Sequence, residues 1–412
     1  MRWALLCAVV TLATLSLAAW PAPGASVASG SFNILDYAPP GTVVDQQGQA
    51  DASPALAGAI RAANLRTARG LPGCVHIPAG IYRIASAPPP FARAGCVKGD
   101  GSSQSILRLD KRFAGDLFSW SEAWYPTTPG PTVVGLRIDG SPTAPARQNA
   151  LMFYDRNDEV FIDDVTVNDL PGRALYSGVT RHSSQAYMRE SHMRSLRFFR
   201  DGAPGTPVVE FTSAGKAPTG ATNEIRVSQM DIYGSRGPSL VIRNQGDGAV
   251  RDLTFDALRI EGTENGDTAA DLLTIGDPVM RGVVGDITFT GLELIDPYRG
   301  FAAFRMTAPR GAIVPGTVTA SGFIGGGLPH GEGLRIDAGR TSTFRFSVVN
   351  TEGTNIVIGP GVSEIVLDGG GQERRWTKSI DPTSRRGVLA PARRNVPLDE
   401  EGAEGPPSTG LP

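Results

Sequence analysis

The sequence predicts an all-β protein that folds as a single-stranded parallel β-helix with a short N-terminal capping helix. Three observations support this prediction. A pattern of apolar residues recurs about every thirty residues, a second short apolar segment follows each copy, and the chain is rich in turn-forming residues. It contains 51 glycines and 32 prolines among 412 residues, while aromatic residues make up only 7%. This composition is more typical of a turn-rich β protein than of a helical one.

The recurring pattern has apolar residues at the first, third, sixth and eighth of eight positions. Alternation within such short segments indicates strands with one buried and one solvated face. One unit cannot bury its apolar face alone, so consecutive units must stack and pair each strand with its equivalent in the next turn. A β-sandwich or a propeller also contains many short strands, but these units are too short for propeller blades. The best copies are Val160–Val167, Ile225–Ile232, Leu253–Ile260 and Ile287–Leu294.

The stretch from Cys74 to Ile84 shows how the coil is expected to turn. It contains two strand-like runs, Val75–Ile77 and Ile81–Ile84, separated by Pro78-Ala79-Gly80. Proline cannot donate to a sheet ladder and glycine weakens a strand interior. We therefore expect a corner of the first coil at these three residues.

A helix is predicted just before this corner. Ser53 is suited to cap its N-terminus, Pro54 suits its first position, and Gly70 is suited to end it. Because the open end of a solenoid exposes its apolar core, we expect this helix to cover the N-terminal end of the coil.

The two ends of the chain differ from its middle. We expect residues 1–28 to be a signal peptide, because Arg2 precedes an uncharged apolar stretch and small residues follow at Ser26-Val27-Ala28. The alternative is an uncleaved membrane anchor, although the stretch is short for a span of about 20 residues. The remaining divisions are an extended segment with the capping helix at 29–72, the β-helix at 73–380, and a disordered tail at 381–412. The protein is thus expected to be secreted or periplasmic, without membrane contact after cleavage.

Cysteine content and charge exclude some classes of partner. In an exported chain, Cys74 and Cys96 are expected to form a disulfide, with two buried free thiols as the alternative. Cys7 is expected to leave with the signal peptide, and the two remaining cysteines with four scattered histidines do not make a zinc site. A net charge of −2 without long runs of Lys or Arg argues against nucleic-acid binding. Oligomeric state is not indicated.

The N-terminal segments resemble a known family. "FNILDYAPPGTVVDQQGQADASPALAGAIRAAN", "CVHIPAGIYRI" and "CVKGDGSSQSILRL" are similar to the N-terminal signature of the pectate lyase superfamily, in its rhamnogalacturonase/epimerase-like group. The resemblance covers about residues 32–110, and Asp45 and Asp51 stand apart where the family has paired acids. It implies a right-handed, pectin-lyase-like parallel β-helix and carbohydrate-directed activities: polyuronate lyases, glycoside hydrolases and epimerases. The matching residues are Phe32, Asn33, Asp36, Pro78, Gly80, Tyr82, Gly99 and Gly101.

Two neighbouring polar clusters supply candidate catalytic groups. Glycoside hydrolysis needs two carboxylates that flank the scissile bond, whereas β-elimination on a uronate needs a base and a cation. The segment "IDDVTVND" is the densest acidic cluster, and the histidine- and arginine-rich segment 176–194 follows it. The alternatives are a strand-end turn bound by backbone amides for the paired acids, and ordinary loop polarity for the basic segment. The predicted catalytic residues are Asp163, Asp164, Asp169, Arg181, His182 and His192.

A column of exposed residues is expected between the third and fourth apolar positions of each copy. Its members are Arg137, Thr166, Arg197, Asp231, Arg259 and Glu293. The column is interpreted either as a ladder of ion pairs on a solvated face, each of little energetic value, or as part of a groove for a glycan. The predicted substrate-binding residues are Arg194, Arg197, Asp231 and Glu293.

The sequence therefore favours an exported carbohydrate-active protein acting on an acidic polysaccharide or exopolysaccharide, as a polysaccharide lyase or a glycoside hydrolase. No cofactor is required; a calcium site would need converging carboxylates, which the spacing permits but does not demand. The alternative is a non-catalytic β-helix that binds glycan or serves a surface role. Trp120, Trp124 and Tyr125 form the densest aromatic group and fit either interpretation.

Overall fold

The computed structural model describes residues 30–389 with gaps. Residues outside the following ranges are not described: 30–92, 95–123, 130–144, 147–181, 185–216, 219–262, 270–280, 282–296, 301–307, 316–325, 332–337, 342–350, 355–358, 364–367, 377–380 and 388–389. The described part contains 29 strands, which pair in parallel, and one α-helix. The predicted all-β parallel β-helix is confirmed. The signal peptide expected at 1–28 lies outside the described residues. None of the described helices is long and apolar enough to cross a membrane.

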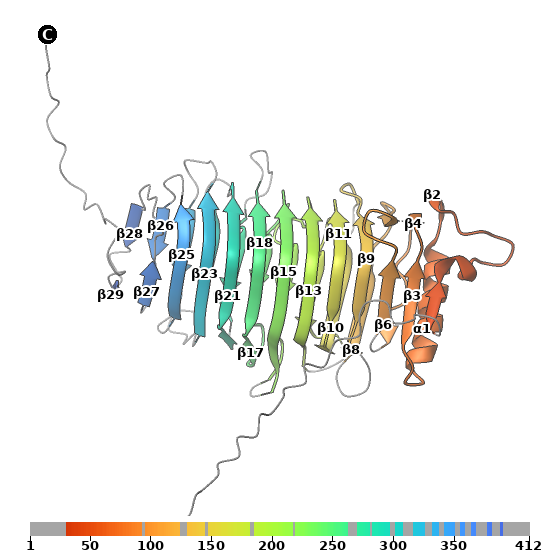
Figure 1. Cartoon of the computed structure of the whole chain (residues 1–412), viewed down its shortest axis with the longest axis horizontal. Coiled ribbons are helices and arrows are strands. Elements are labelled where there is room, and N and C mark those ends of the chain that lie inside the picture. Colours follow the sequence, from red (N-terminus) through yellow and green to blue (C-terminus); the bar gives the residue numbers. More distant parts are fainter. Residues whose placement is uncertain are drawn as a thin grey trace, which may run out of the picture.

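Each coil contributes strands to successive faces of the rod, so strands from one coil lie beside their equivalents in the next (Figure 1). We call the face with the longest strands face A. It contains β9 (Thr132–Asp139), β11 (Phe161–Asn168), the second part of β13 (Tyr187–Phe199) and of β15 (Ala221–Tyr233), β18 (Leu253–Glu261), β21 (Ile287–Ile295), β23 (Gly316–Gly325), β25 (Ser342–Asn350), β27 (Glu364–Leu367) and β29 (Val388–Leu389).

Two other faces complete the coil. Face C is short and is formed by the end of β10, the starts of β13 and β15, β17 (Ala249–Val250) and β20 (Val283–Val284). Face B contains β8 (Gly115–Ala123), the first part of β10 (Gln148–Asp158), β12 (Leu175–Val179), β14 (Val209–Phe211), β16 (Leu240–Ile242), β19 (Leu273–Gly276), β22 (Ala302–Thr307), β24 (Glu332–Asp337), β26 (Asn355–Ile358) and β28 (Thr377–Ile380).

The apolar pattern predicted from the sequence fills the interior of this coil. Its members on β11, Ile162, Val165 and Val167, are fully buried. Aromatic side chains stack from coil to coil: the ring of Trp120 lies 5.2 Å from Phe91 and 4.9 Å from Phe153. Trp120 is therefore part of the core and is not available to a glycan, while Trp124 and Tyr125 lie outside the described residues.

Face A is bent along its length, and the bend explains the two adjacent variable positions inside the apolar pattern. One residue there adopts a left-handed conformation, with φ between 50° and 67°, and is skipped in the pairing between neighbouring strands. Asp163 pairs with Arg194 and Val165 pairs with Leu196, so Asp164 stands between two ladder positions. The column, which we call the bulge column, consists of Gly135, Asp164, Ser195, Gln229, Ala257 and Gly291.

The bulge column ends at β23. Phe289 pairs with Ala320 and Leu292 pairs with Gly322, so this strand has one residue fewer than β21 across the bend. Aligning the sequence copies by their apolar residues would pair Leu292 with Phe323. Because β23 has one residue fewer, this alignment is wrong by one residue.

The N-terminal end of the rod has the expected corner. β3 (Gly73–Ile77) and β4 (Gly80–Ile84) are separated by Pro78 and Ala79. Asp100 holds this corner by accepting a hydrogen bond from the backbone of Ala79 and by pairing with His76 at 2.8 Å. The strands below and above it are β1 (Ser31–Asn33), β2 (Gln47–Asp51), β6 (Gly95–Gly99) and β7 (Ser105–Leu109), with β5 (Phe91–Ala92) beside β8.

A helix covers this end, as predicted. α1 (Ser53–Thr67) buries Leu56, Ile60 and Ala63 against the first coils, after the short 3-10 helix η1 (Ile34–Tyr37). The expectation that Ser53 caps the helix is wrong, because Ala52 is the cap residue. The Ser53 hydroxyl is used instead to accept hydrogen bonds from the backbone of Ala85 and Ser86.

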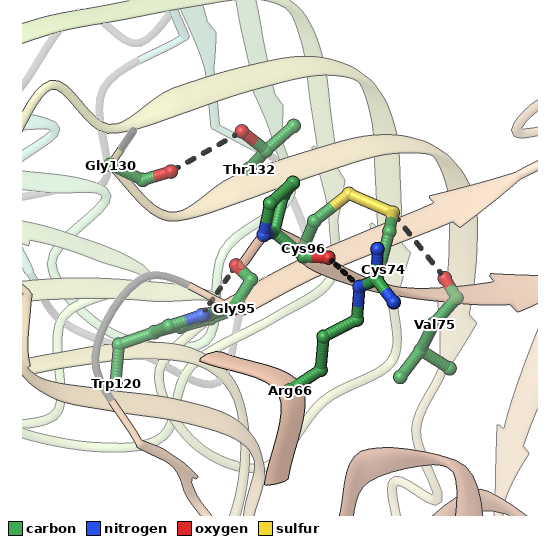
Figure 2. The surroundings of a disulfide bond; sticks show 9 residues. Arg66, Cys74, Val75, Gly95, Cys96, Trp120, Gly130 and Thr132 are labelled. Carbon is green, nitrogen blue, oxygen red and sulfur yellow. Dashed lines mark hydrogen bonds between the residues drawn. A yellow bond between two sulfur atoms is a disulfide. The ribbon is translucent and has the colours of Figure 1, made fainter. Parts of the chain in front are cut away.

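The predicted disulfide between Cys74 and Cys96 is confirmed. The two cysteines are direct partners in the ladder between β3 and β6, with Cα atoms 4.3 Å apart. Figure 2 shows the bond beside Gly95, whose carbonyl oxygen accepts a hydrogen bond from the indole of Trp120 at 2.9 Å. The bond therefore fixes the coil of β3 and β4 to the coil of β6 and β7. At the other end, β29 pairs with β27 and lies within the segment predicted to be a disordered tail.

Replacing both Cys74 and Cys96 by serine is expected to lower the free energy of unfolding by about 3 kcal/mol, because the bond closes a loop whose ends are 22 residues apart. Denaturant titration monitored by circular dichroism measures the change. Dithiothreitol should destabilise the wild type by a similar amount and leave the double variant unchanged. Equal midpoints for the wild type and the variant would contradict the prediction.

Ala257→Gly is expected to stabilise the protein by about 0.5 to 1 kcal/mol. Ala257 has a φ of 54°, which costs an L-residue about 1–2 kcal/mol and costs glycine little. The matched control is Ala320→Gly on the neighbouring part of face A, where Ala320 is fully buried and the same change should destabilise. Thermal unfolding of the two variants tests this difference; a lower melting temperature for Ala257→Gly contradicts it.

Candidate functional site

A surface groove runs along the rod at the corner where face C meets face A. It has a volume of about 680 Å³ and crosses β13, β15, β18, β21 and β23. Two columns of side chains line it. The acidic column consists of Glu190, Glu224, Asp252 and Asp286, and the polar column consists of His192, Arg226, Thr254, Thr288 and Thr319.

The acidic column is placed by the corner of the coil. Its four residues have φ between 50° and 57°, and each directly precedes a residue in register on face A: Ser191, Ile225, Leu253 and Ile287. The left-handed conformation turns the chain from one face to the next. Strands in register lie about 4.8 Å apart, so the column presents exposed carboxylates at regular intervals along the rod.

Each face A strand that lines the groove contributes one residue to the polar column, namely its first residue whose side chain points outward. His192 pairs with Arg226, which pairs with Thr254, and Thr288 and Thr319 continue the ladder. Burial and the positive charge of Arg226 lower the pKa of His192 below its usual value of 6.5. The imidazole is therefore neutral at pH 7 and able to accept a proton. Arg226 is exposed and brings a positive charge to the groove.

The three predicted catalytic aspartates lie on face A or at its far corner, away from the groove lining. Asp163 forms an ion pair with Arg194 at 2.7 Å, and Asp164, in the bulge column, accepts hydrogen bonds from the backbone and hydroxyl of Ser102. Asp169 bridges Arg200 and Arg236 at 2.7 and 3.0 Å. These contacts hold neighbouring coils together and leave the catalytic role of the aspartates a prediction.

The predicted basic residues are spread over different faces. His192 lines the groove, whereas the guanidinium of Arg181 lies over the ring of Tyr154 at 4.8 Å, beyond β12. His182 lies outside the described residues. The structure thus brings His192 together with acidic residues other than those expected.

The predicted substrate-binding residues belong to face A. Arg197, Asp231 and Glu293 fall in one column in the predicted register, with Arg259 between the last two. Arg259 pairs with Glu261 at 2.6 Å and approaches Glu293 at 3.8 Å. These contacts match the ion-pair interpretation of the column, and a role in glycan binding stays a prediction.

The acidic column was missed in the sequence although a signal for it exists. An acid directly precedes each of five successive copies of the apolar pattern: Glu159, Glu190, Glu224, Asp252 and Asp286. An acid at a fixed place in a repeat becomes a column once the repeats stack. The search for acids inside one copy, at "IDDVTVND", overlooked a periodicity between copies.

No arrangement of three or more histidine, cysteine, aspartate or glutamate side chains suited to hold a metal ion occurs among the described residues. The carboxylates of the acidic column follow one another along the rod and do not converge on one point, as calcium ligands must. The chemistry available in the groove is therefore that of carboxylates, one imidazole, one guanidinium and hydroxyl groups.

Comparisons with known proteins identify the fold. No protein-family model and no curated protein matches the sequence. The protein ORF18 of Geobacillus virus E2 superposes with a TM-score of 0.54 at 11% identity, over 85% of this chain and 60% of the viral one. This chain thus spans about 60% of the length of that protein.

Two solved structures with lower TM-scores are also similar. The A-module of the mannuronan C-5 epimerase AlgE4 of Azotobacter vinelandii gives 0.43 at 14% identity, over 87% of this chain and 99% of that one. The catalytic unit of a GH87 alpha-1,3-glucanase of Streptomyces thermodiastaticus gives 0.34 at 15% identity, over 89% and 69%. The parallel pairing of the strands from coil to coil gives a parallel β-helix, the architecture that the N-terminal resemblance implied. At these identities the likeness concerns the fold alone.

Arg226→Met should raise the pKa of His192 toward 6.5, because the change removes the nearby positive charge and keeps an apolar side chain of similar length. Proton NMR titration of the histidine ring signals measures this shift, and His192→Gln identifies the signal. Arg251→Met, which removes a guanidinium that contacts Asp252, is the control and should leave the pKa unchanged. A His192 pKa that does not rise in Arg226→Met contradicts the geometry.

Proposed function

We propose that the protein is an exported carbohydrate-active enzyme that binds an extended polysaccharide along the groove and hydrolyses it. One observation carries this proposal: carboxylates on four successive coils line one groove together with hydroxyl, imidazole and guanidinium groups. A polymer with many hydroxyl groups can hydrogen-bond to such a surface over several coils. The disulfide supports an oxidising location, either secreted or periplasmic.

The spacing of the coils suits glycoside hydrolysis. Retaining hydrolases place two carboxyl groups about 5–5.5 Å apart, and adjacent strands lie about 4.8 Å apart. Glu224 and Asp252 occupy adjacent coils at the centre of the groove. One carboxyl group of this pair would donate its proton to the glycosidic oxygen while the other carboxylate attacks the anomeric carbon. Water would then hydrolyse the covalent intermediate and return the proton to the first group.

β-Elimination is supported less well. His192 is a neutral base at pH 7 and Arg226 is a cation, so the pair has the groups that a lyase needs. A uronate bound beside them would, however, place its carboxylate next to Glu190 and Glu224, which lie two residues before them on the same strands. Like charges at this distance repel, and we therefore assign the pair to binding of sugar hydroxyls.

The variants Glu224→Gln and Asp252→Asn test the proposed function. Each should lower the rate of release of reducing ends from a panel of neutral, acidic and amino-sugar polysaccharides by about 10² to 10⁴-fold, since a positioned acid or base contributes that much. Asp296→Asn is the matched control, because Asp296 has the same left-handed conformation at the opposite end of β21.

Three results would contradict hydrolysis at this pair. Products with a new unsaturated bond, detected by ultraviolet absorbance and lost in His192→Ala, would assign a lyase instead. Full activity in Glu224→Gln and Asp252→Asn would show that other residues catalyse the reaction. Binding without any product from the whole panel would leave a non-catalytic glycan-binding protein.

A further inference from the structure

The groove has an excess of negative charge, because four carboxylates and a single guanidinium, that of Arg226, line it. Several carboxylates on face A and at its far corner pair with arginines, as Asp163 does with Arg194 and Asp169 with Arg200. In the groove, Glu190 and Glu224 form no ion pair with any described residue, and Asp252 makes one exposed contact with Arg251 at 3.5 Å. Since the net charge of the whole chain is only −2, this negative charge is local.

The backbone does not explain why this column is acidic. The bulge column has the same left-handed conformation on consecutive coils, and its residues are chemically mixed, including Gly135, Ser195, Gln229 and Ala257. Glycine or asparagine meets such a conformation at lower cost than glutamate. Conformation alone would therefore allow a mixed column at the groove as well, whereas all four left-handed residues that line the groove are Glu or Asp.

Stacked carboxylates also oppose folding, because neighbouring coils bring like charges close together. A bound ligand with regularly spaced positive charges would remove this repulsion. A flat acidic surface would attract any cation, but here the acidic column lines a groove together with the polar column, which contains His192, Arg226 and three threonines. The groove therefore offers both carboxylates for amines and hydroxyl groups for sugar hydroxyls.

We infer that the groove accepts a cationic glycan, a polymer of amino sugars whose amino groups are free. This inference rests on the proposed function, in which the groove binds a polysaccharide. It departs from the sequence-based expectation of an acidic polymer, because a uronate chain would meet the acidic column along its whole length. The amines of the glycan pair with Glu190, Glu224, Asp252 and Asp286, and its hydroxyl groups face the threonines and His192.

Isothermal titration calorimetry of the full chain tests the inference with oligomers of equal length: glucosamine, N-acetylglucosamine and a uronic acid. The glucosamine oligomer should bind at least about ten-fold more tightly than its N-acetylated form, and the uronate oligomer least. The preference should fall when the salt concentration rises from 0.1 to 1 M, since screening shortens from about 10 Å to about 3 Å. A lysine oligomer serves as a cation without sugar and should bind more weakly than the glucosamine oligomer.

The triple variant Glu190→Gln, Glu224→Gln, Asp252→Asn should lose the preference and still bind the N-acetylated oligomer, which shows that it is folded. Asp296→Asn should keep the preference. Equal or tighter binding of the N-acetylated or uronate oligomer overturns the inference and leaves the proposed function standing. Equal binding of the lysine oligomer overturns the assignment to a glycan. If no oligosaccharide binds and no polysaccharide is cleaved, the inference and the proposed function both fail.

Discussion

Parallel pairing between consecutive coils is the constraint on which the rest of this structure depends. Because each strand residue lies directly beside its equivalent in the next coil, whatever the sequence repeats becomes a continuous column. Repeated apolar residues form the core, repeated left-handed residues form the bend of face A, and repeated acids line the groove. The core, the bend and the candidate site therefore all result from the same in-register pairing of strands between coils.

The fold could be predicted because the apolar pattern that specifies it recurs in the sequence at regular intervals. The apolar pattern located the strands of face A, and its two adjacent variable positions already contained the left-handed residue of the bulge column. β23 lacks that extra residue, and there an alignment of the sequence copies by their apolar residues is wrong by one position. The prediction that Ser53 caps α1 was wrong for a different reason. Its hydroxyl bonds to the backbone beyond β4, a contact far away in the sequence that local rules do not contain.

The candidate site was harder to predict, and two groups of residues show why. Asp163, Asp164 and Asp169 are neighbours in the sequence, but the extended chain and the bulge separate them into different columns, where arginines or backbone groups bind them. Glu190, Glu224, Asp252 and Asp286 are far apart in the sequence and become neighbours through stacking. Density along the chain is thus a poor guide to a site in a solenoid, whereas recurrence at one place in the repeat is a good one.

The disulfide between Cys74 and Cys96 also affects the order in which the rod can lose its coils. In a stacked array each coil is held mainly by its neighbours, so loss of structure begins at an end and spreads inward. Here the coil of β3 is bonded covalently to the coil of β6 and packs against α1, so these two coils cannot separate from each other one at a time. The groove lies several coils further along the chain, between β13 and β23. The disulfide-bonded end thus protects that stretch of coils from unravelling on one side.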